Sequence, residues 1–355
     1  MATTNYISRL PSELVHDVLR YVDLPADLTS VALADRRLHT MANERLYRDV
    51  SISSASQAVK FLLQAVYKPV DPRFRRVRTL SLYFKTTHSF PSLLALIKTA
   101  LSHLLALKDL KVNLINISSR DWDIAVLIFP ENPAFQLQSF QTSLRCHRMN
   151  TALSSFIETQ MELQELDLSG RSPRPSSPFV LSTAALPRLN LFRTIHCPPD
   201  LISKIVSGRP LECISVTLFS EDDFLSIRML SRSSRPIRLL TVIIIEHASS
   251  IDFFANVAGH LPGLEEFHAM SVVHAYTAEM LHAATSILPL FKTLHTIMFL
   301  ATNAGVSPMP LEEEGALAEA WGRSCPSLKT IALPSLEVWS RIGSKWISSS
   351  VPSDA

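Results

Sequence analysis

The chain has 355 residues, 47% of them hydrophobic, and a mean hydropathy of +0.18, which excludes a largely disordered protein. Its 34 Lys and Arg residues against 32 Asp and Glu residues leave a formal charge of +2, so we expect neither nucleic acid nor a membrane as a partner. The longest β-type apolar run, from Thr241 to Ile245, is far shorter than a membrane-spanning helix.

The first residues of the chain and the placement of its cysteines favour a reducing compartment. The first residues, MATTNYISR, lack the apolar core of a secretion signal. The four cysteines, Cys146, Cys197, Cys213 and Cys325, lie far apart and include no C-x-x-C pair. We therefore expect a cytoplasmic or nuclear protein without a structural metal, a disulfide framework or a cofactor.

Three short helices are predicted at the start of the chain. Leu10, Leu14 and Val18 recur at helical spacing, Pro11 suits a first helical turn, and Pro25 forces a turn before the next helix. The apolar residues expected inside the second and third helices are Leu28, Val31 and Ala32, then Leu38, Met41 and Leu46. About forty residues bury little by themselves, so their remaining apolar surface needs the rest of the chain or a partner.

The order of residues in this segment resembles the F-box. The matching residues are Leu10-Pro11, Glu13-Leu14, Val18-Leu19, Tyr21-Val22, Leu24, Leu28, Leu33, Arg36-Arg37-Leu38 and the closing NERLYRDV. The resemblance implies a three-helix module over 7–50 that docks onto the Skp adaptor and, through it, onto a cullin–RING ubiquitin ligase. The adaptor-facing residues it implies are Leu10, Pro11, Leu14, Val18, Leu24, Leu28 and Leu33.

A degenerate repeat follows, in which an apolar residue is followed three and five positions later by others. The ten instances begin at Val77, Leu107, Leu137, Leu163, Leu189, Leu211, Ile237, Leu264, Leu294 and Leu328. Successive starts are 22 to 34 residues apart, as from Leu189 to Leu211 and from Leu294 to Leu328. This spacing straddles the ~20–29 residues of leucine-rich repeats.

The repeat resembles the LxxLxL core of the leucine-rich-repeat family, although the asparagine or cysteine that usually follows is missing. The resemblance implies an α/β horseshoe solenoid with a parallel sheet over 51–335, in about ten repeats. Segments such as PSLLALIKTALSHL, with Leu94, Ile97, Leu101 and Leu104 on one stripe, predict helices on its convex side. For the end of the solenoid we predict an amphipathic capping helix over 336–350, with Val338, Trp339, Ile342 and Trp346 inward.

No catalytic motif interrupts this pattern. The chain has no GxSxG, GxGxxG, P-loop or HExxH, and its 8 glycines are too dispersed to form a phosphate cradle, so we do not expect an enzyme.

Two sets of residues are candidates for contact with a target protein. Leu239 and Ile243 alternate with core positions and are expected on the concave face, unless another part of the chain covers them. Arg145, Arg148, Arg171 and Arg174 follow the third and fourth predicted strands, and Arg193 lies on the next strand. Such arginines either hold a phosphate or carboxylates together or are separately solvated.

The function that these features predict is a substrate receptor, in which the F-box-like module holds the ligase and the solenoid holds a target protein. The alternative is a repeat scaffold whose first helices cap the array and recruit no ligase. Co-purification with the Skp adaptor separates the two.

Overall fold

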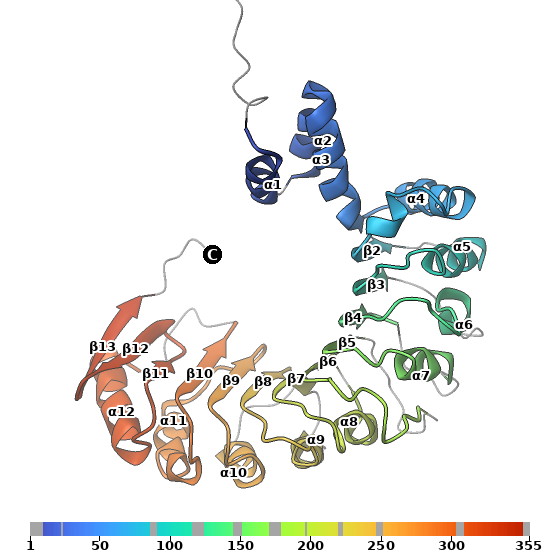
Figure 1. Ribbon diagram of the computed structural model, residues 1–355. Helices are drawn as coiled ribbons and strands as arrows, with labels where there is room; N and C mark the ends of the chain where they lie inside the picture. The colour runs from blue at the N-terminus through green and yellow to red at the C-terminus, as the bar shows by residue number, and fades with distance from the viewer. Residues whose placement is uncertain are drawn as a thin grey trace, which may run out of the picture. The chain divides into compact units, whose positions relative to one another are not determined.

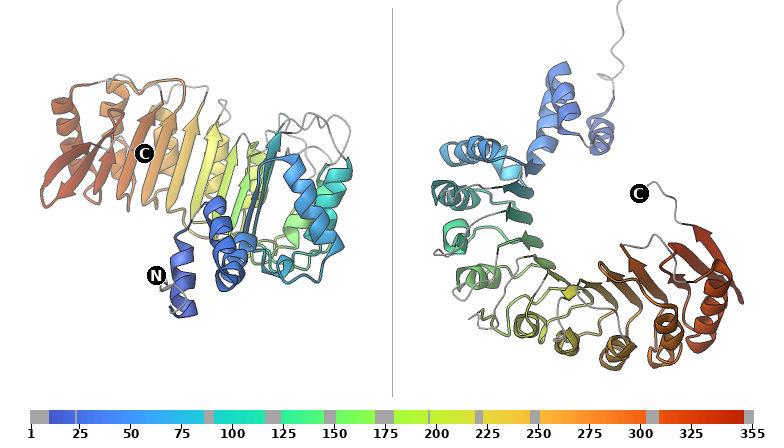
Figure 2. Two further views of the ribbon diagram at one scale, coloured as in Figure 1. Left: turned by 90° about the horizontal axis from the view of Figure 1, so that it is seen from above. Right: turned by 180° about the vertical axis from the view of Figure 1, so that it is seen from behind.

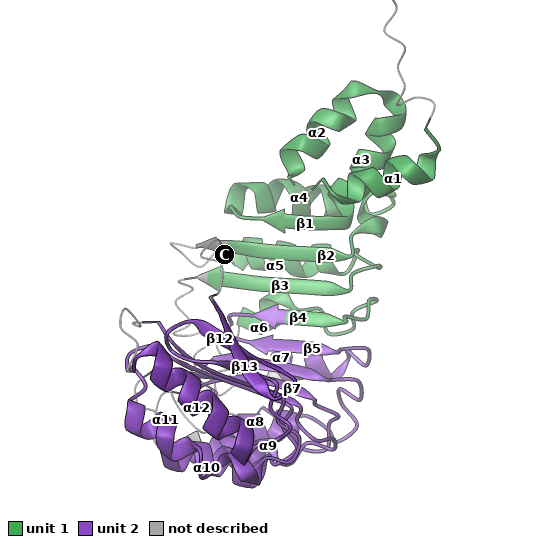
Figure 3. Cartoon of the chain, turned by 90° about the vertical axis from the view of Figure 1, so that its left-hand side faces the viewer, with its two compact units in different colours: residues 1–140 green, residues 141–355 purple. Residues whose placement is uncertain are grey.

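The structure, a computed structural model, divides the chain into two compact units, unit 1 (1–140) and unit 2 (141–355) (Figure 3). The residues it describes are 10–22, 24–85, 91–115, 124–144, 151–169, 179–195, 197–218, 223–245, 251–302 and 309–350.

Unit 1 starts with three helices and continues with strands that alternate with helices (Figure 1). Its elements are α1 (Ser12–Arg20), α2 (Pro25–Ala34), α3 (Arg36–Arg48), β1 (Asp49–Ile52), α4 (Ala55–Tyr67), the 3₁₀ turn η2 (Phe74–Arg76), β2 (Thr79–Lys85), α5 (Pro91–Leu101), β3 (Asp109–Ile115), α6 (Ile124–Ile128) and the start of β4 (Ser139–Thr142). The three predicted N-terminal helices are confirmed. Strand β1 and helix α4 precede the first repeat that the sequence pattern identifies.

Unit 2 continues the alternation and ends in two antiparallel strands. Its further elements are α7 (Thr151–Glu158), β5 (Glu165–Leu168), β6 (Leu191–Ile195), α8 (Pro199–Val206), β7 (Cys213–Leu218), α9 (Asp223–Leu230), β8 (Leu239–Ile244), α10 (Ile251–His260), β9 (Glu266–Ser271), α11 (Ala278–Ala284), the 3₁₀ turn η3 (Leu288–Leu290), β10 (Thr296–Ala301), α12 (Leu311–Ser324), β11 (Thr330–Ala332), β12 (Glu337–Ile342) and β13 (Lys345–Ser350).

The strands form a 13-stranded sheet whose hydrogen-bonded order follows the sequence from β1 to β13. The described pairs up to β11 are parallel, for example Ile214 of β7 opposite Leu240 of β8 and Phe267 of β9. The strands of β6 to β10 lie side by side, and the helices of unit 2 cover one of their faces (Figure 2). The predicted class, an α/β fold with a parallel sheet behind N-terminal helices, is confirmed.

The ten predicted triplets supply the core. Every member is buried, from Val77, Leu80 and Leu82 in the first triplet to Leu328, Ile331 and Leu333 in the last. In the strands the second and third members point to the same side because successive side chains alternate between the faces of a sheet. The predicted stripe of α5 is buried as well, since Leu94, Ile97 and Leu101 are at most 4% exposed.

Aromatic rings link the last repeats of unit 2. Phe254 of α10 has its ring centroid 5.6 Å from that of Phe267, 5.5 Å from Phe291 and 5.8 Å from Phe299. Phe299 in turn lies 5.7 Å from Trp321 of α12. Two of these pairs are tilted and two are edge-on, and edge-on pairs stabilise beyond the area that they bury.

A buried arginine closes α8. Arg209 is 2% exposed and follows Gly208, whose φ of 74° is the left-handed conformation common after a helix. Its guanidinium donates to the carbonyl oxygens of Lys204 (2.7 Å) and Ile205 (3.1 Å) at the helix end, and to those of Ser182 (2.9 Å) and Ala185 (3.0 Å). Burial lowers the pKa of Arg209 from its usual value. The carbonyls therefore stand in for the water that this cation loses.

The predicted capping helix over 336–350 is wrong, because β12 and β13 form an antiparallel hairpin there. Ile342 pairs with Lys345, which leaves a two-residue turn with Gly343 at φ 64°, at the position where type II′ turns carry glycine. A β-carbon on Gly315 of α12 would lie 3.0 Å from the Trp339 ring, so this indole packs closely on the helix. The hairpin thus covers α12 in place of a terminal helix.

Candidate functional site

The first three helices of unit 1 enclose a small core of their own. Val15 and Leu19 of α1, Leu28 of α2 and Met41 of α3 are buried together. The partly buried residues packed against them are Val22, Val31, Leu38 and Leu46. We call α1, α2 and α3 the helical module.

Helix α1 also carries a second apolar stripe, which faces solvent. Leu10 is 40% exposed, Leu14 50%, Val18 62% and Tyr21 86%. Leu14 and Val18 share one face of α1, with Leu10 just before the helix and Tyr21 just after it, whereas Val15 and Leu19 lie on another face. We call Leu10, Leu14, Val18 and Tyr21 the α1 stripe.

The predicted adaptor-facing set is divided by the structure. Leu10, Pro11, Leu14, Val18, Leu24 and Leu33 are exposed, with Leu24 at 63% and Leu33 at 82%. Leu28 is 4% exposed and belongs to the core of the helical module. Its expected outward role is therefore wrong. Leu28 lies on the same face of α2 as Val31 and Ala32, and this face packs against α3.

Polar contacts hold the helices of the module in place. Asp35 caps α3 by accepting from the backbone of Arg37 at 2.7 Å. The Arg37 guanidinium donates to the backbone oxygen of Leu10 at 2.6 Å and to Ser12 Oγ at 3.0 Å. His39 contacts the backbone oxygen of Ala32 through Nδ1 (3.1 Å) and the side-chain nitrogen of Asn43 through Nε2 (2.8 Å). Nδ1 can thus donate to the Ala32 oxygen while Nε2 accepts from the Asn43 amide.

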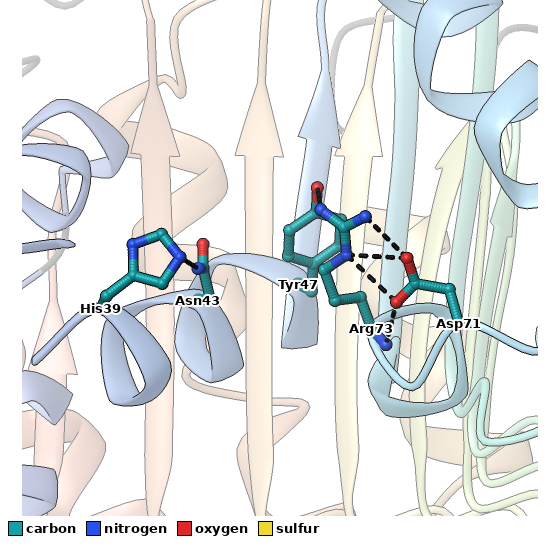
Figure 4. Close-up of polar contacts among 5 residues, drawn as sticks. All are labelled: His39, Asn43, Tyr47, Asp71 and Arg73. Carbon is teal, nitrogen blue, oxygen red and sulfur yellow. Dashed lines mark hydrogen bonds and ion pairs between the residues drawn. The ribbon is translucent and has the colours of Figure 1, made fainter. Parts of the chain in front are cut away.

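An aromatic and ionic cluster joins α3 to the following segment of unit 1 (Figure 4). Arg73 donates through Nε to Asp71 Oδ1 at 3.1 Å, through Nη2 to Asp71 Oδ2 at 2.6 Å, and through Nη1 to Tyr47 Oη at 3.1 Å. The side-chain and backbone hydrogen bonds from Arg73 lower the pKa of Asp71 to about 2. The Tyr47 ring meets Phe74 edge-on at 6.0 Å, and Phe74 is fully buried. These contacts fix the end of α3 against η2.

The candidate target-binding residues that the structure describes lie on strands of unit 2. Leu239 and Ile243 are half-buried on β8, two strand positions either side of Thr241, on the sheet face opposite the buried Leu240 and Val242. Arg193 is exposed on β6, on the same face. Arg145, Arg148, Arg171 and Arg174 lie outside the described residues. Their proposed convergence therefore stays a prediction.

Residues 7–53 match the family described as F-box-like, and they span the helical module. No curated protein matches the chain. The chain thus has an F-box-like domain followed by a long parallel sheet of alternating strands and helices. This domain suggests the role of a substrate adaptor in a ubiquitin ligase.

None of the helices in the described ranges is long and apolar enough to span a membrane. The described part of the chain also contains no group of three or more His, Cys, Asp or Glu side chains arranged to hold a metal ion.

Proposed function

We propose that this protein is the substrate-recognition subunit of an SCF-type cullin–RING ubiquitin ligase. In this proposal the α1 stripe binds the Skp adaptor, and the repeat region binds a target protein. The observation that carries the proposal is the exposure of Leu14 and Val18 within the segment that matches the F-box-like family. Exposed apolar stripes on a helix are typical of protein-binding surfaces.

The helical module gives a physical reason for a partner on this side. Its core is formed by Val15, Leu19, Leu28 and Met41, whereas Leu14, Val18 and Tyr21 of the α1 stripe leave half or more of their surface in water. Burying it against another protein would remove apolar surface from water at about 25 cal/mol per Å². A receptor of this kind makes and breaks no bonds. It accelerates ubiquitin transfer by raising the effective concentration of the target near the ligase, a gain of ~10²–10⁴.

For the target, we propose that the sheet face of unit 2 opposite its helices supplies the contact through Leu239 and Ile243. Both side chains are half-buried by their strand neighbours and keep surface for a partner. Exchange of Ile243 for Lys is expected to reduce capture of a target while adaptor binding stays unchanged. Loss of adaptor binding in this variant would contradict the division of labour.

The test of adaptor docking uses the full chain and a purified Skp adaptor. Leu14→Glu with Val18→Glu places two charges on the α1 stripe and is expected to weaken binding by about 30-fold or more, as for a docking hot spot. The matched control is Tyr67→Glu with Val70→Glu, since these unit 1 residues are 79% and 73% exposed and lie outside the F-box-like segment.

The outcomes separate the receptor from the scaffold. Binding by the parent and the control, with loss in the α1 variant and unchanged circular dichroism, supports the receptor. A folded parent chain that does not bind the adaptor contradicts it and favours the scaffold that recruits no ligase.

A further inference from the structure

A cavity of about 530 Å³ lies within unit 1, beside the helical module and the segment from η2 to the start of β2. Its volume is in the range of small-molecule sites. Six arginines line it, namely Arg20, Arg45, Arg48, Arg75, Arg76 and Arg78. Apolar side chains, Leu19 and Met41 among them, complete the wall.

The cavity has an excess of positive charge. Its acidic lining residues are Glu13, Asp17 and Glu44, and Asp49 pairs with the lining residues Arg45 and Arg48, so six guanidinium groups against four carboxylates leave a formal charge of +2 with His16 neutral. Two of the lining carboxylates are also engaged, because Arg76 lies 2.6 Å from Glu44 and Arg20 lies 3.1 Å from Asp17.

The guanidinium groups of Arg75 and Arg78 have no ion pair or hydrogen bond with any residue that the structure describes. Arg78 is nevertheless held in a fixed place by its backbone, whose nitrogen donates to the oxygen of Arg48 at 2.8 Å. Arg75 lies in η2 and Arg78 directly precedes β2, and both line the cavity, where their like charges repel. An anion between them would remove this repulsion.

We propose that this cavity binds a small ligand that carries phosphate groups. Guanidinium groups present paired donors that match phosphate oxygens, and a charge of +2 suits an anion with two or more negative charges. The apolar wall removes part of the water that would otherwise screen these contacts. Such a ligand would bridge α1 and α3 of the helical module to the beginning of the repeats.

The cavity is distinct from the surface proposed for the adaptor. Glu13, His16, Asp17 and Arg20 line it, and their spacing of three and four residues defines a third face of α1. The α1 stripe and the buried pair Val15 and Leu19 occupy the other two faces. Ligand binding in the cavity and adaptor binding on the stripe are therefore separable, and this inference does not depend on the proposed function.

The experiment is calorimetric titration of the full chain with tripolyphosphate at fixed ionic strength. Arg75→Gln with Arg78→Gln removes both unpaired cations, and we expect affinity to fall on the order of 100-fold, since each charged hydrogen-bond donor contributes about tenfold. The control, Arg36→Gln with Lys60→Gln, makes the same change in net charge at exposed unit 1 residues outside the cavity, and it should bind as the parent does.

Further titrations distinguish the kind of ligand. Citrate, a carboxylate anion of comparable charge, is expected to bind more weakly than tripolyphosphate, and a comparison of pyrophosphate with a phosphomonoester shows whether one phosphate group suffices. If the double variant does not fold, Arg75→Gln alone is used, with an expected loss of about tenfold. The proposal is overturned if the parent shows no saturable binding, or if the cavity and control variants bind tripolyphosphate equally.

Adaptor binding by the cavity variant is measured in parallel. It should equal that of the parent, so a failure of the phosphate site and a failure of adaptor docking give different results.

Discussion

Helix α1 of the helical module and strand β8 of unit 2 both carry apolar residues at regular spacing, but their surroundings differ. In β8, Leu240, Val242 and Ile244 are at most 4% exposed, because a strand flanks each edge and helices cover one face. In α1, Val18 stays 62% exposed although Leu19 beside it is 5% exposed. A repeat array supplies the cover for its own apolar rows, whereas a three-helix module covers only one stripe of each helix. The remaining stripe is available to another protein.

The largest expected effect comes from the interior of unit 2. Phe254→Ala removes a ring that contacts three other aromatic rings, and we expect the free energy of unfolding to fall by about 3–5 kcal/mol. Leu14→Ala on the α1 stripe removes a side chain that is 50% exposed, so its effect should stay within about 1 kcal/mol. Urea denaturation followed by tryptophan fluorescence and circular dichroism measures both. If both variants lost the same unfolding free energy, the proposed difference between the interior of unit 2 and the α1 stripe would be contradicted.

The buried arginine should rank second. Arg209→Met leaves the carbonyl oxygens of Lys204, Ile205, Ser182 and Ala185 without their donor, and a loss of about 3 kcal/mol in unfolding free energy is expected. Arg209→Lys keeps the charge without the planar set of donors, so its stability should fall between the parent and the Met variant. A Met variant as stable as the parent in the same denaturation assay would show that these bonds contribute nothing net.

A third prediction contrasts two helical glycines of unit 2. A β-carbon on Gly322 of α12 would lie 2.5 Å from Trp346 Nε1, so Gly322→Ala should displace the hairpin and cost about 1–3 kcal/mol. Gly259 of α10 has no such neighbour within 4 Å, and Gly259→Ala should instead stabilise the chain by up to about 1 kcal/mol through helix propensity. Thermal unfolding of both variants gives the two signs. If Gly322→Ala stabilised the chain, the close contact between the hairpin and α12 would be contradicted.

The smallest expected effect is a pH dependence at the join between α3 and η2. The pKa of Asp71 is about 2 in the folded chain and 3.8 in its ordinary state, so the unfolded chain takes up the proton first as pH falls. The contribution of Asp71 to stability is complete above about pH 4 and is lost as pH falls to about 2. Its size should stay below about 1 kcal/mol, as for other solvent-accessible ion pairs.

The measurement compares the parent with Asp71→Asn across this range. The stability difference between them should shrink from pH 5 to pH 2. A difference that is constant with pH would mean that the Arg73 interaction does not depend on the charge of Asp71.

The repeats could be predicted from the sequence because their signal is local. Each triplet places its second and third apolar residues two positions apart, so both face the same side of a strand, and the first enters the core just before it. Helix α5 could be predicted from the sequence as well, since Leu94, Ile97 and Leu101 recur at helical spacing and form one apolar stripe. The order of residues over the first fifty positions was enough to indicate the F-box-like module.

Tertiary packing decided the rest. Helix α1 has two apolar stripes, and only its contacts with α2 and α3 select Val15 and Leu19 for the core and leave Leu14 and Val18 outside. The same contacts bury Leu28. The C-terminal tryptophans fit a helix or a hairpin by spacing, and the Gly343 turn together with the glycines of α12 selects the hairpin. The arginine cavity joins residues from Glu13 to Ala106, a proximity that no local pattern encodes because it depends on long-range chain packing.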